Sequence, residues 1–144
     1  MKIKGSGILF SIILTLTIIS LSVVLTLACK PLYYLDIHAL HLTERTGYTE
    51  QEIRENYDVL IDCYLSFGDG SLEFPTLAMS ESGRIHFEEV KAIFNQFKYM
   101  ALIGTVLSVA GILWMRRKQQ YGYLKWTSLL SAVLPTVIGI AVAL

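Results

Sequence analysis

The sequence predicts an all-α membrane protein with three transmembrane helices and a mainly helical extracellular cap between helices 1 and 2. Two observations lead to this fold class. Hydrophobic residues make up 53% of the 144-residue chain, and they gather in three uncharged blocks at residues 8–28, 99–115 and 126–144. All the acidic residues lie between the first two blocks. Because a helix of about 20 apolar residues crosses the hydrocarbon core of a bilayer, we expect each block to span the membrane.

The charges predict which side of the membrane each segment occupies. Residues 29–98 carry twelve acidic and six basic side chains, a net charge of −6, while the other six basic residues lie before the first block and between the second and third. Short loops rich in Lys and Arg stay in the cytoplasm. We therefore expect a multi-pass protein of the cell membrane, with a cytoplasmic N-tail at 1–7, an extracellular cap at 29–98 and a cytoplasmic loop at 116–125.

The first block allows two interpretations. It ends at residues 25–29, Leu-Thr-Leu-Ala-Cys, which is similar to a secretory signal closed by a lipobox cysteine. The apolar run is, however, longer than the roughly 7–15 residues of a cleaved signal. Four small polar residues also fall on one side of a helix, as in helices that pack closely in membranes: Ser11, Thr15, Ser22 and Thr26. We expect a retained helix, with a cleaved signal as the alternative.

The second block carries a comparable surface of small residues, formed by Ala101, Gly104, Thr105 and Ser108. Small side chains let two helix backbones approach each other in a bilayer. We expect this surface to contact another helix.

The cap is expected to be mainly helical. Thr49-Glu50-Gln51-Glu52 matches a capping box and is followed by apolar residues at helical spacing, which predicts a helix at 50–67. Gly-Asp-Gly-Ser at 68–71 predicts a turn, and the residue before Pro75 favours extended backbone. After residue 83, apolar residues at three- and four-residue spacing lead into the second block, which predicts one long helix.

The three histidines are candidates for catalysis or for metal binding. His86 lies near the start of the long helix with Glu89 three residues on, so the carboxylate can orient the imidazole for general-base work. An ordinary surface pair is the alternative. His38 and His41 are spaced to share a helical face with Tyr34, and with His86 they would offer three zinc ligands. No cysteine or acidic ligand pattern accompanies them, so we expect no metal and no cofactor.

Cys29 and Cys63 would both face an oxidising compartment in this topology, where cysteines can form a disulfide. The sequence does not place their Cα atoms within bonding distance. A disulfide and two unpaired cysteines therefore both stay open.

Several function classes find no support in the sequence. The chain has no Gly-rich phosphate loop, no Gly-x-Ser-x-Gly elbow and no Cys-x-x-Cys pair. The expected cap is strongly acidic, which argues against binding to nucleic acid.

Three stretches carry a family resemblance. They are Thr46-Gly47-Tyr48-Thr49, then Asn56-Tyr57-x-x-Leu60-Ile61, and Gly-Arg-Ile-His-Phe-Glu-Glu-Val-Lys-Ala-Ile-Phe at 83–94. Together they resemble the lipoprotein intramolecular transacylase family over nearly the whole chain. The last stretch is similar to the family pattern His-x-x-Asp-Val-Lys-x-x-Phe, with Glu89 in the Asp position. The resemblance implies an enzyme of Gram-positive membranes with four helices under an extracellular cap.

The implied reaction moves the sn-2 acyl chain of a diacylglyceryl-modified lipoprotein onto the amino group of its own N-terminal cysteine, leaving a lyso-form lipoprotein. We expect His86 to be the catalytic base, and the supporting groups to be Glu89, Lys91 and Tyr57. An aromatic lining for the substrate is offered by Tyr33, Tyr34 and Phe87. Alternatively, these aromatic residues only build the core of the cap or anchor it at the interface.

The family pattern also includes a second catalytic histidine beyond the third helix, followed by a fourth helix. This chain ends at Leu144 with neither, so we expect a C-terminally shortened member or a fragment. The predicted function is the acyltransferase. The alternative is a shortened, non-catalytic membrane protein whose cap binds a lipoprotein or a protein partner.

Overall fold

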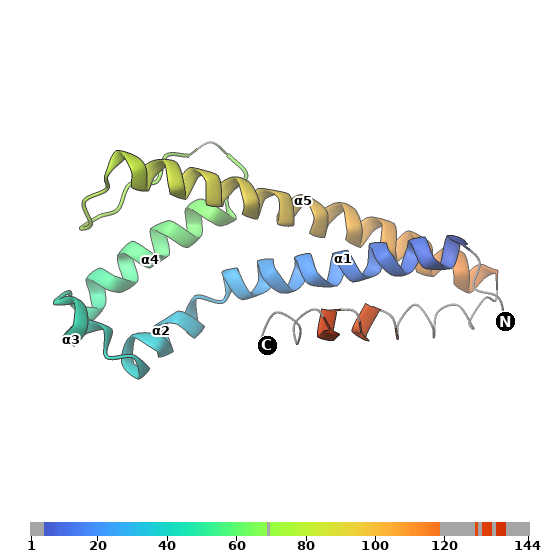
Figure 1. Ribbon diagram of the computed structural model, residues 1–144, viewed down its shortest axis with the longest axis horizontal. Coiled ribbons are helices and arrows are strands. Elements are labelled where there is room, and N and C mark those ends of the chain that lie inside the picture. The colour runs from blue at the N-terminus through green and yellow to red at the C-terminus, as the bar shows by residue number, and fades with distance from the viewer. Residues whose placement is uncertain (1–4, 69, 119–128, 130, 134, 138–144) are drawn as a thin grey trace. The chain divides into compact units, whose positions relative to one another are not determined.

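The computed structural model describes residues 5–68, 70–118, 129, 131–133 and 135–137, and its regular secondary structure there is all helical (Figure 1). The helices are α1 (Gly5–Ala28), α2 (Lys30–Ala39), α3 (Leu42–Thr46), α4 (Glu50–Leu65) and α5 (Glu81–Arg117). The chain divides into two compact units. We call residues 24–96 the polar unit, and residues 1–23 together with 97–144 the apolar unit.

Two of the described helices are long and apolar enough to cross a membrane. They are Gly7–Ala28 of α1 and Glu81–Arg117, the whole of α5. Only 22% and 17% of their most apolar windows are buried, whereas the core helix of a soluble protein would be mostly buried. Large apolar side chains point outward along both helices, among them Leu9, Leu102 and Val106. Such outward apolar surfaces suit contact with lipid.

Within the apolar unit, α1 packs against α5 at Gly104 and Ser108 of the expected surface, whereas Thr105 of that surface is exposed. Gly104 faces Thr17, and a Cβ at this glycine would overlap the Thr17 side chain. The Thr17 and Ser108 hydroxyls lie 3.4 Å apart. About two turns beyond Gly104, Gly111 leaves room for the ring of Phe10. Glycine suits both positions because a Cβ there would overlap the α1 side chain that packs against it.

The predicted stripe of small polar residues on α1 is only half right. Ser11 and Thr15 are buried, but Ser22 and Thr26 are exposed. A second buried set, which includes Thr17 and Ser20, lies on another side of the helix. Two faces of α1 are therefore covered, and the contact with α5 accounts for the one with Thr17.

The third apolar block at 126–144 lies largely outside the described residues, as do the tail at 1–4 and residues 119–125 of the expected loop. Residues 129, 131–133 and 135–137 are helical, and Ser131 is buried.

In the polar unit, α4 begins with the predicted capping box. The Thr49 side chain accepts a hydrogen bond from the Glu52 N–H at 3.2 Å, and the Glu52 carboxylate accepts one from the Thr49 N–H at 2.8 Å. The helix ends at Leu65, two residues earlier than expected. Its apolar side buries Ile61 and Tyr64, and Tyr64 packs against Phe94 with ring centroids 5.1 Å apart. These residues form the core of the unit together with Ile37.

The segment before α4 is broken into two helices. Pro31 lies in the first turn of α2, where its missing N–H costs nothing. The helix ends at Ala39, because His41 takes up left-handed backbone with φ of 50° and caps α3. Tyr34 and His38 therefore share α2, but the expectation that His41 continues their face is wrong.

The long helix α5 begins slightly earlier than expected, at Glu81. Ser80 caps it, since its hydroxyl accepts a hydrogen bond from the Gly83 N–H at 3.1 Å. It then continues without interruption to Arg117, which confirms the prediction of a single long helix.

Candidate active site

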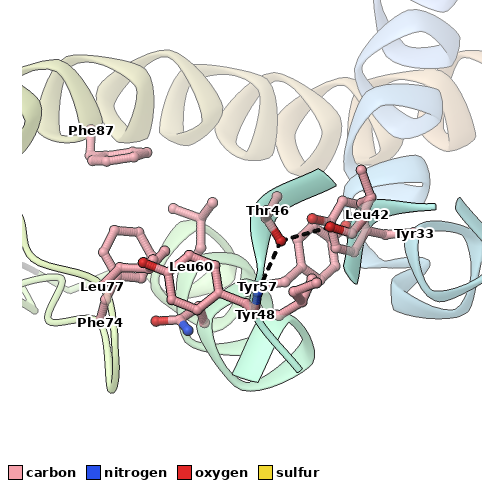
Figure 2. A pocket seen from close by; sticks show the side chains of 11 residues that line it. Tyr33, Leu42, Thr46, Tyr48, Tyr57, Leu60, Phe74, Leu77 and Phe87 are labelled. Atoms are coloured by element: carbon pink, nitrogen blue, oxygen red, sulfur yellow. Dashed lines mark hydrogen bonds between the residues drawn. The ribbon is translucent and has the colours of Figure 1, made fainter. Parts of the chain in front are cut away.

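The polar unit contains an apolar cavity of about 410 Å³ (Figure 2). One side of α4 forms its floor with Ile53, Tyr57 and Leu60. Phe87 points toward it from α5, opposite Phe74 and Leu77 of the segment between the two helices. The other lining residues are Tyr33, Leu42, Thr46, Tyr48 and Asn56. The volume lies within the range of roughly 300–1,000 Å³ that is usual for small-molecule sites.

Stacked tyrosines close one end of the cavity. The rings of Tyr33 in α2 and Tyr57 in α4 lie 3.9 Å apart between centroids and 13° from parallel. Burial raises the pKa of both phenols, so each is neutral at physiological pH. Tyr33 and Tyr57 therefore bring uncharged aromatic rings to this end of the cavity.

A polar network lies behind this stack. Tyr34 does not line the cavity; its hydroxyl donates a hydrogen bond to the Asp58 carboxylate at 2.5 Å, which raises the pKa of the phenol. Lys30 pairs with Asp62 at 2.7 Å and with Asp58 at 3.5 Å. The guanidinium of Arg54 covers the Tyr34 ring at 4.5 Å from its centroid. The network joins α2 to α4 and holds Tyr33 against Tyr57.

The wall opposite the tyrosine stack is formed by residues 66–80, which contain no helix or strand in their described part. Phe74 packs edge-to-face against Phe87, with centroids 5.4 Å apart. The side chain of Asn56 bonds to Thr76, and the ammonium of Lys91 bonds to the carbonyl of Gly70; both residues are buried. These contacts fix the wall to α4 and α5.

His86 lies next to Phe87 in sequence but does not line the cavity. Its side chain is exposed, and its ring centroid lies 6.0 Å from that of Phe87. Glu89 is also exposed, and no hydrogen bond or ion pair joins it to His86 within the described part of the chain. The geometry therefore does not pair the two side chains, and their catalytic roles stay predictions.

The structure brings together part of the predicted site. Tyr33, Tyr57 and Phe87 share one cavity, while Tyr34 and His86 lie outside its lining. Lys91, predicted as a supporting group, bonds to the wall segment.

The other histidines and the cysteines do not join the cavity. His38 lies 3.3 Å from Glu50, and His41 lies 3.7 Å from Glu44. The described residues contain no group of three or more His, Cys, Asp or Glu side chains arranged for a metal. Cys29 and Cys63 are free thiols in this structure.

Sequence reasoning missed several lining residues. Phe74 and Leu77 lie in a segment without periodicity, so nothing in the pattern signalled their role. Asn56 was part of a noted motif, but its partner Thr76 lies 20 residues further on. Helical spacing predicts a single apolar face on α4 that includes Ile53, Tyr57 and Leu60. In the structure this face divides between the core and the cavity. Ile61 and Tyr64 turn into the core, while the first three line the cavity.

Comparison with known proteins places the chain in context. The family model for lipoprotein intramolecular transacylase Lit matches residues 8–144. The solved structure of the membrane integral lipoprotein intramolecular transacylase Lit from Bacillus cereus is similar, with a TM-score of 0.87 and 32% sequence identity over 95% of this chain and 64% of that one. Two variants of that protein, with a histidine replaced by alanine or by arginine, give TM-scores of 0.86 at 31% identity. They are matched over 95% of this chain and over 62% and 61% of their own.

The chain thus spans less than two thirds of the length of these solved structures. No curated protein matches it significantly.

Proposed function

Because the chain belongs to the lipoprotein intramolecular transacylase family, we propose that it moves the sn-2 acyl chain of a diacylglyceryl-modified lipoprotein onto the amino group of the same N-terminal cysteine. The product is a lyso-form lipoprotein. The partner is then a lipoprotein held in the same membrane, and the protein itself is a membrane protein with two described apolar helices.

The observation that carries this proposal is the cavity of about 410 Å³. Its walls are aliphatic and aromatic, with few polar groups, of which Asn56 is bonded within the wall. A lining of this kind stabilises a hydrocarbon chain by excluding water from it. We assign the cavity to the migrating acyl chain.

The reaction needs a base, because the cysteine amine is protonated at neutral pH. In the proposed step, His86 takes a proton from the ammonium, and the free amine attacks the carbonyl carbon of the sn-2 ester. A C–N bond forms and the C–O bond to glycerol breaks. The His86 imidazolium gives its proton to the glyceryl oxygen, which leaves as a hydroxyl, and the imidazole takes the second proton that the nitrogen loses as the amide forms. Support comes from the match of His86 to the family pattern and from its position one residue before Phe87. Glu89 is proposed to favour the imidazolium that forms.

We propose that the chain crosses the membrane three times, with the N-terminus inside and the segment at 29–98 outside as an extracellular cap. The net charge of −6 on this segment and the basic residues on both flanking segments support this orientation. The proposal keeps α1 as a membrane helix rather than a cleaved signal. The close fit of Thr17 to Gly104 and of Phe10 to Gly111 supports retention, because a cleaved α1 would leave both glycines without a partner surface.

One observation favours a second candidate, a cap that binds lipoproteins without acyl transfer. His86 is exposed and has no contact with Glu89 in the described structure, so the base is not yet held in a reacting geometry. Catalytic hydrogen bonds often form only in the substrate complex, which is why we place the enzyme first.

The test uses a host that lacks lyso-form lipoproteins and carries a reporter lipoprotein. Expression of the chain should yield lyso-form N-terminal peptide by mass spectrometry. His86→Ala should reduce the conversion rate about 10²- to 10⁴-fold, the usual contribution of general acid–base catalysis. The matched control is His38→Ala, which removes another exposed histidine and should leave conversion unchanged.

If His86→Ala inserts into the membrane normally and converts the reporter as fast as the unaltered chain, His86 is not the catalytic base. No conversion by the unaltered chain, together with capture of the reporter lipoprotein, would favour the non-catalytic binding protein.

A further inference from the structure

The wall segment at residues 66–80 is held at two points, each a hydrogen bond from a buried polar side chain. The residues of the segment that line the cavity, Phe74 and Leu77, lie close to these points in sequence. Phe74 lies in sequence between the two residues held there, Gly70 and Thr76, and Leu77 directly follows Thr76. Residues in a segment without helix or strand have few backbone bonds to fix them. The hydrogen bonds at the two points therefore determine the positions of Phe74 and Leu77.

The first point is Asn56 in α4, which is 5% exposed. Its amide nitrogen donates to the Thr76 hydroxyl at 2.5 Å and to the Glu52 carbonyl at 2.6 Å. Its amide oxygen accepts from the Thr76 N–H at 3.4 Å. Both ends of the amide are used, so the side chain has one orientation, and it grips both the backbone and the side chain of Thr76.

The second point is Lys91 in α5, which is 9% exposed. Its ammonium donates to the Gly70 carbonyl at 3.1 Å. Removing an ammonium from water is unfavourable unless it is bonded, so a buried lysine implies a specific acceptor. The thiol of Cys63 lies 3.6 Å from the same carbonyl.

We propose that Asn56 and Lys91 are positioning residues that fix the wall segment, and that Phe74 and Leu77 thereby determine which acyl chains the cavity accepts. This inference rests on the proposed function and deepens it. In this role Asn56 and Lys91 act through the wall segment and not on the ester or the amine. Phe74 also packs against Phe87, so a shift of the segment changes both aromatic walls at once.

The position of the ammonium separates this role from catalysis. A lysine that took part in proton transfer would have to reach the reacting atoms, whereas Lys91 is bonded to a main-chain carbonyl of the wall. Loss of Lys91 should therefore change substrate preference while the pH profile of the reaction keeps its shape.

The first experiment measures the wall directly and needs no activity. Amide hydrogen exchange of peptides from residues 66–80 is followed by mass spectrometry in the unaltered protein, in Asn56→Leu and in Lys91→Met. Either substitution should speed amide exchange in residues 66–80 about tenfold, because it removes a hydrogen bond that limits local opening of this segment. Arg116→Met is the matched control; it removes an exposed cation from the C-terminal end of α5, away from the wall segment, and should leave the exchange unchanged.

Peptides from α4 show in the same data whether each variant is folded. If a variant unfolds, Thr76→Val serves instead, since it removes only the hydroxyl that Asn56 contacts. Unchanged exchange in folded variants would overturn the positioning role.

The second experiment measures chain preference with reporter lipoproteins that carry lauroyl, palmitoyl or stearoyl groups. The variants and Leu77→Ala should raise KM for the preferred chain about tenfold and flatten the differences among chains, with a smaller change in kcat. Lys91→Arg should restore preference, because it keeps a donor at the same place. Faster exchange with unchanged preference would overturn the specificity role. Absence of transfer by the unaltered protein would refute the proposed function, while the exchange result would still decide whether the wall is anchored.

Discussion

The fit of Gly104 to Thr17 predicts that even one methyl group at this glycine destabilises the apolar unit. A Cβ at Gly104 would lie 3.2 Å from the Thr17 Cβ, 3.4 Å from its Cγ2, and in overlap with its hydroxyl oxygen. The threonine cannot easily turn away. It is β-branched, and its hydroxyl donates to the Ile13 carbonyl at 2.7 Å.

Two effects of Gly104→Ala oppose each other. Alanine favours the helix by about 0.5–1 kcal/mol relative to glycine. Overpacking a tight contact costs about 1–3 kcal/mol, and the rigidity of Thr17 places the cost in the upper part of that range. The expected net loss is about 1–2 kcal/mol in the free energy of unfolding, or roughly a 5- to 30-fold change in the folding equilibrium.

The assay is equilibrium unfolding in mixed micelles with increasing SDS, followed by circular dichroism. A double-mutant cycle with Thr17→Ala isolates the contact. Removal of the threonine side chain should make Gly104→Ala nearly neutral, so the coupling energy should match the single-mutant loss. Val106→Ala, on an exposed part of α5, is the control and should change stability by less than about 0.5 kcal/mol. An equal cost of Gly104→Ala with and without Thr17 would refute the reasoning.

Three further predictions concern the cap helix, its core and the topology. Burial raises the pKa of Tyr64 to about 12, so its share of stability should be intact below about pH 10 and lost as pH rises toward 12, because the unfolded chain releases its proton first. Tyr64→Phe should remove that alkaline slope in unfolding experiments, and a slope that persists would contradict the assignment. Thr49→Ala should lower the free energy of unfolding of the polar unit by about 1 kcal/mol through loss of the capping box, which thermal or urea unfolding can measure; a neutral result would show that the box is dispensable. Reporter fusions should place a site near residue 69 outside the cell and one near residue 119 inside, and the reverse result would overturn the proposed orientation.

Much of the helical structure was predictable because it depends on local signals. The capping box at Thr49 and Glu52 satisfies backbone groups within one turn, so its residues can be recognised without a fold. The long helix α5 followed from apolar spacing that runs into an uncharged block. The break at His41 did not follow from the pattern, because a non-glycine residue with positive φ is stabilised by its surroundings rather than by its own preference.

The cavity was predictable only in part, for the same reason. Tyr57 and Phe87 lie on amphipathic helices, and their positions followed from helical spacing. Phe74 belongs to an irregular segment whose course depends on contacts with Asn56 and Lys91, and such contacts between distant residues leave no periodic trace in the sequence.

The exposure of Ser22 in α1 was not predictable from helical spacing either. Helix periodicity shows which residues share a side but not how far along the helix a neighbour extends.

The hydrogen bonds of the two units differ in sequence separation, and this difference sets an order of events during synthesis. Asn56 and Thr76 are 20 residues apart, and Lys91 and Gly70 are 21 apart, so the polar unit can close soon after its last helix begins to emerge. Thr17 and Ser108 are separated by 91 residues. At a synthesis rate of about 5–20 residues per second, α1 is complete roughly 4 to 16 s before its partner surface on α5 exists. During that interval Thr17 has lipid or other proteins as neighbours. Its hydroxyl already donates a hydrogen bond to the Ile13 carbonyl, so it is not left unpaired before α5 is made.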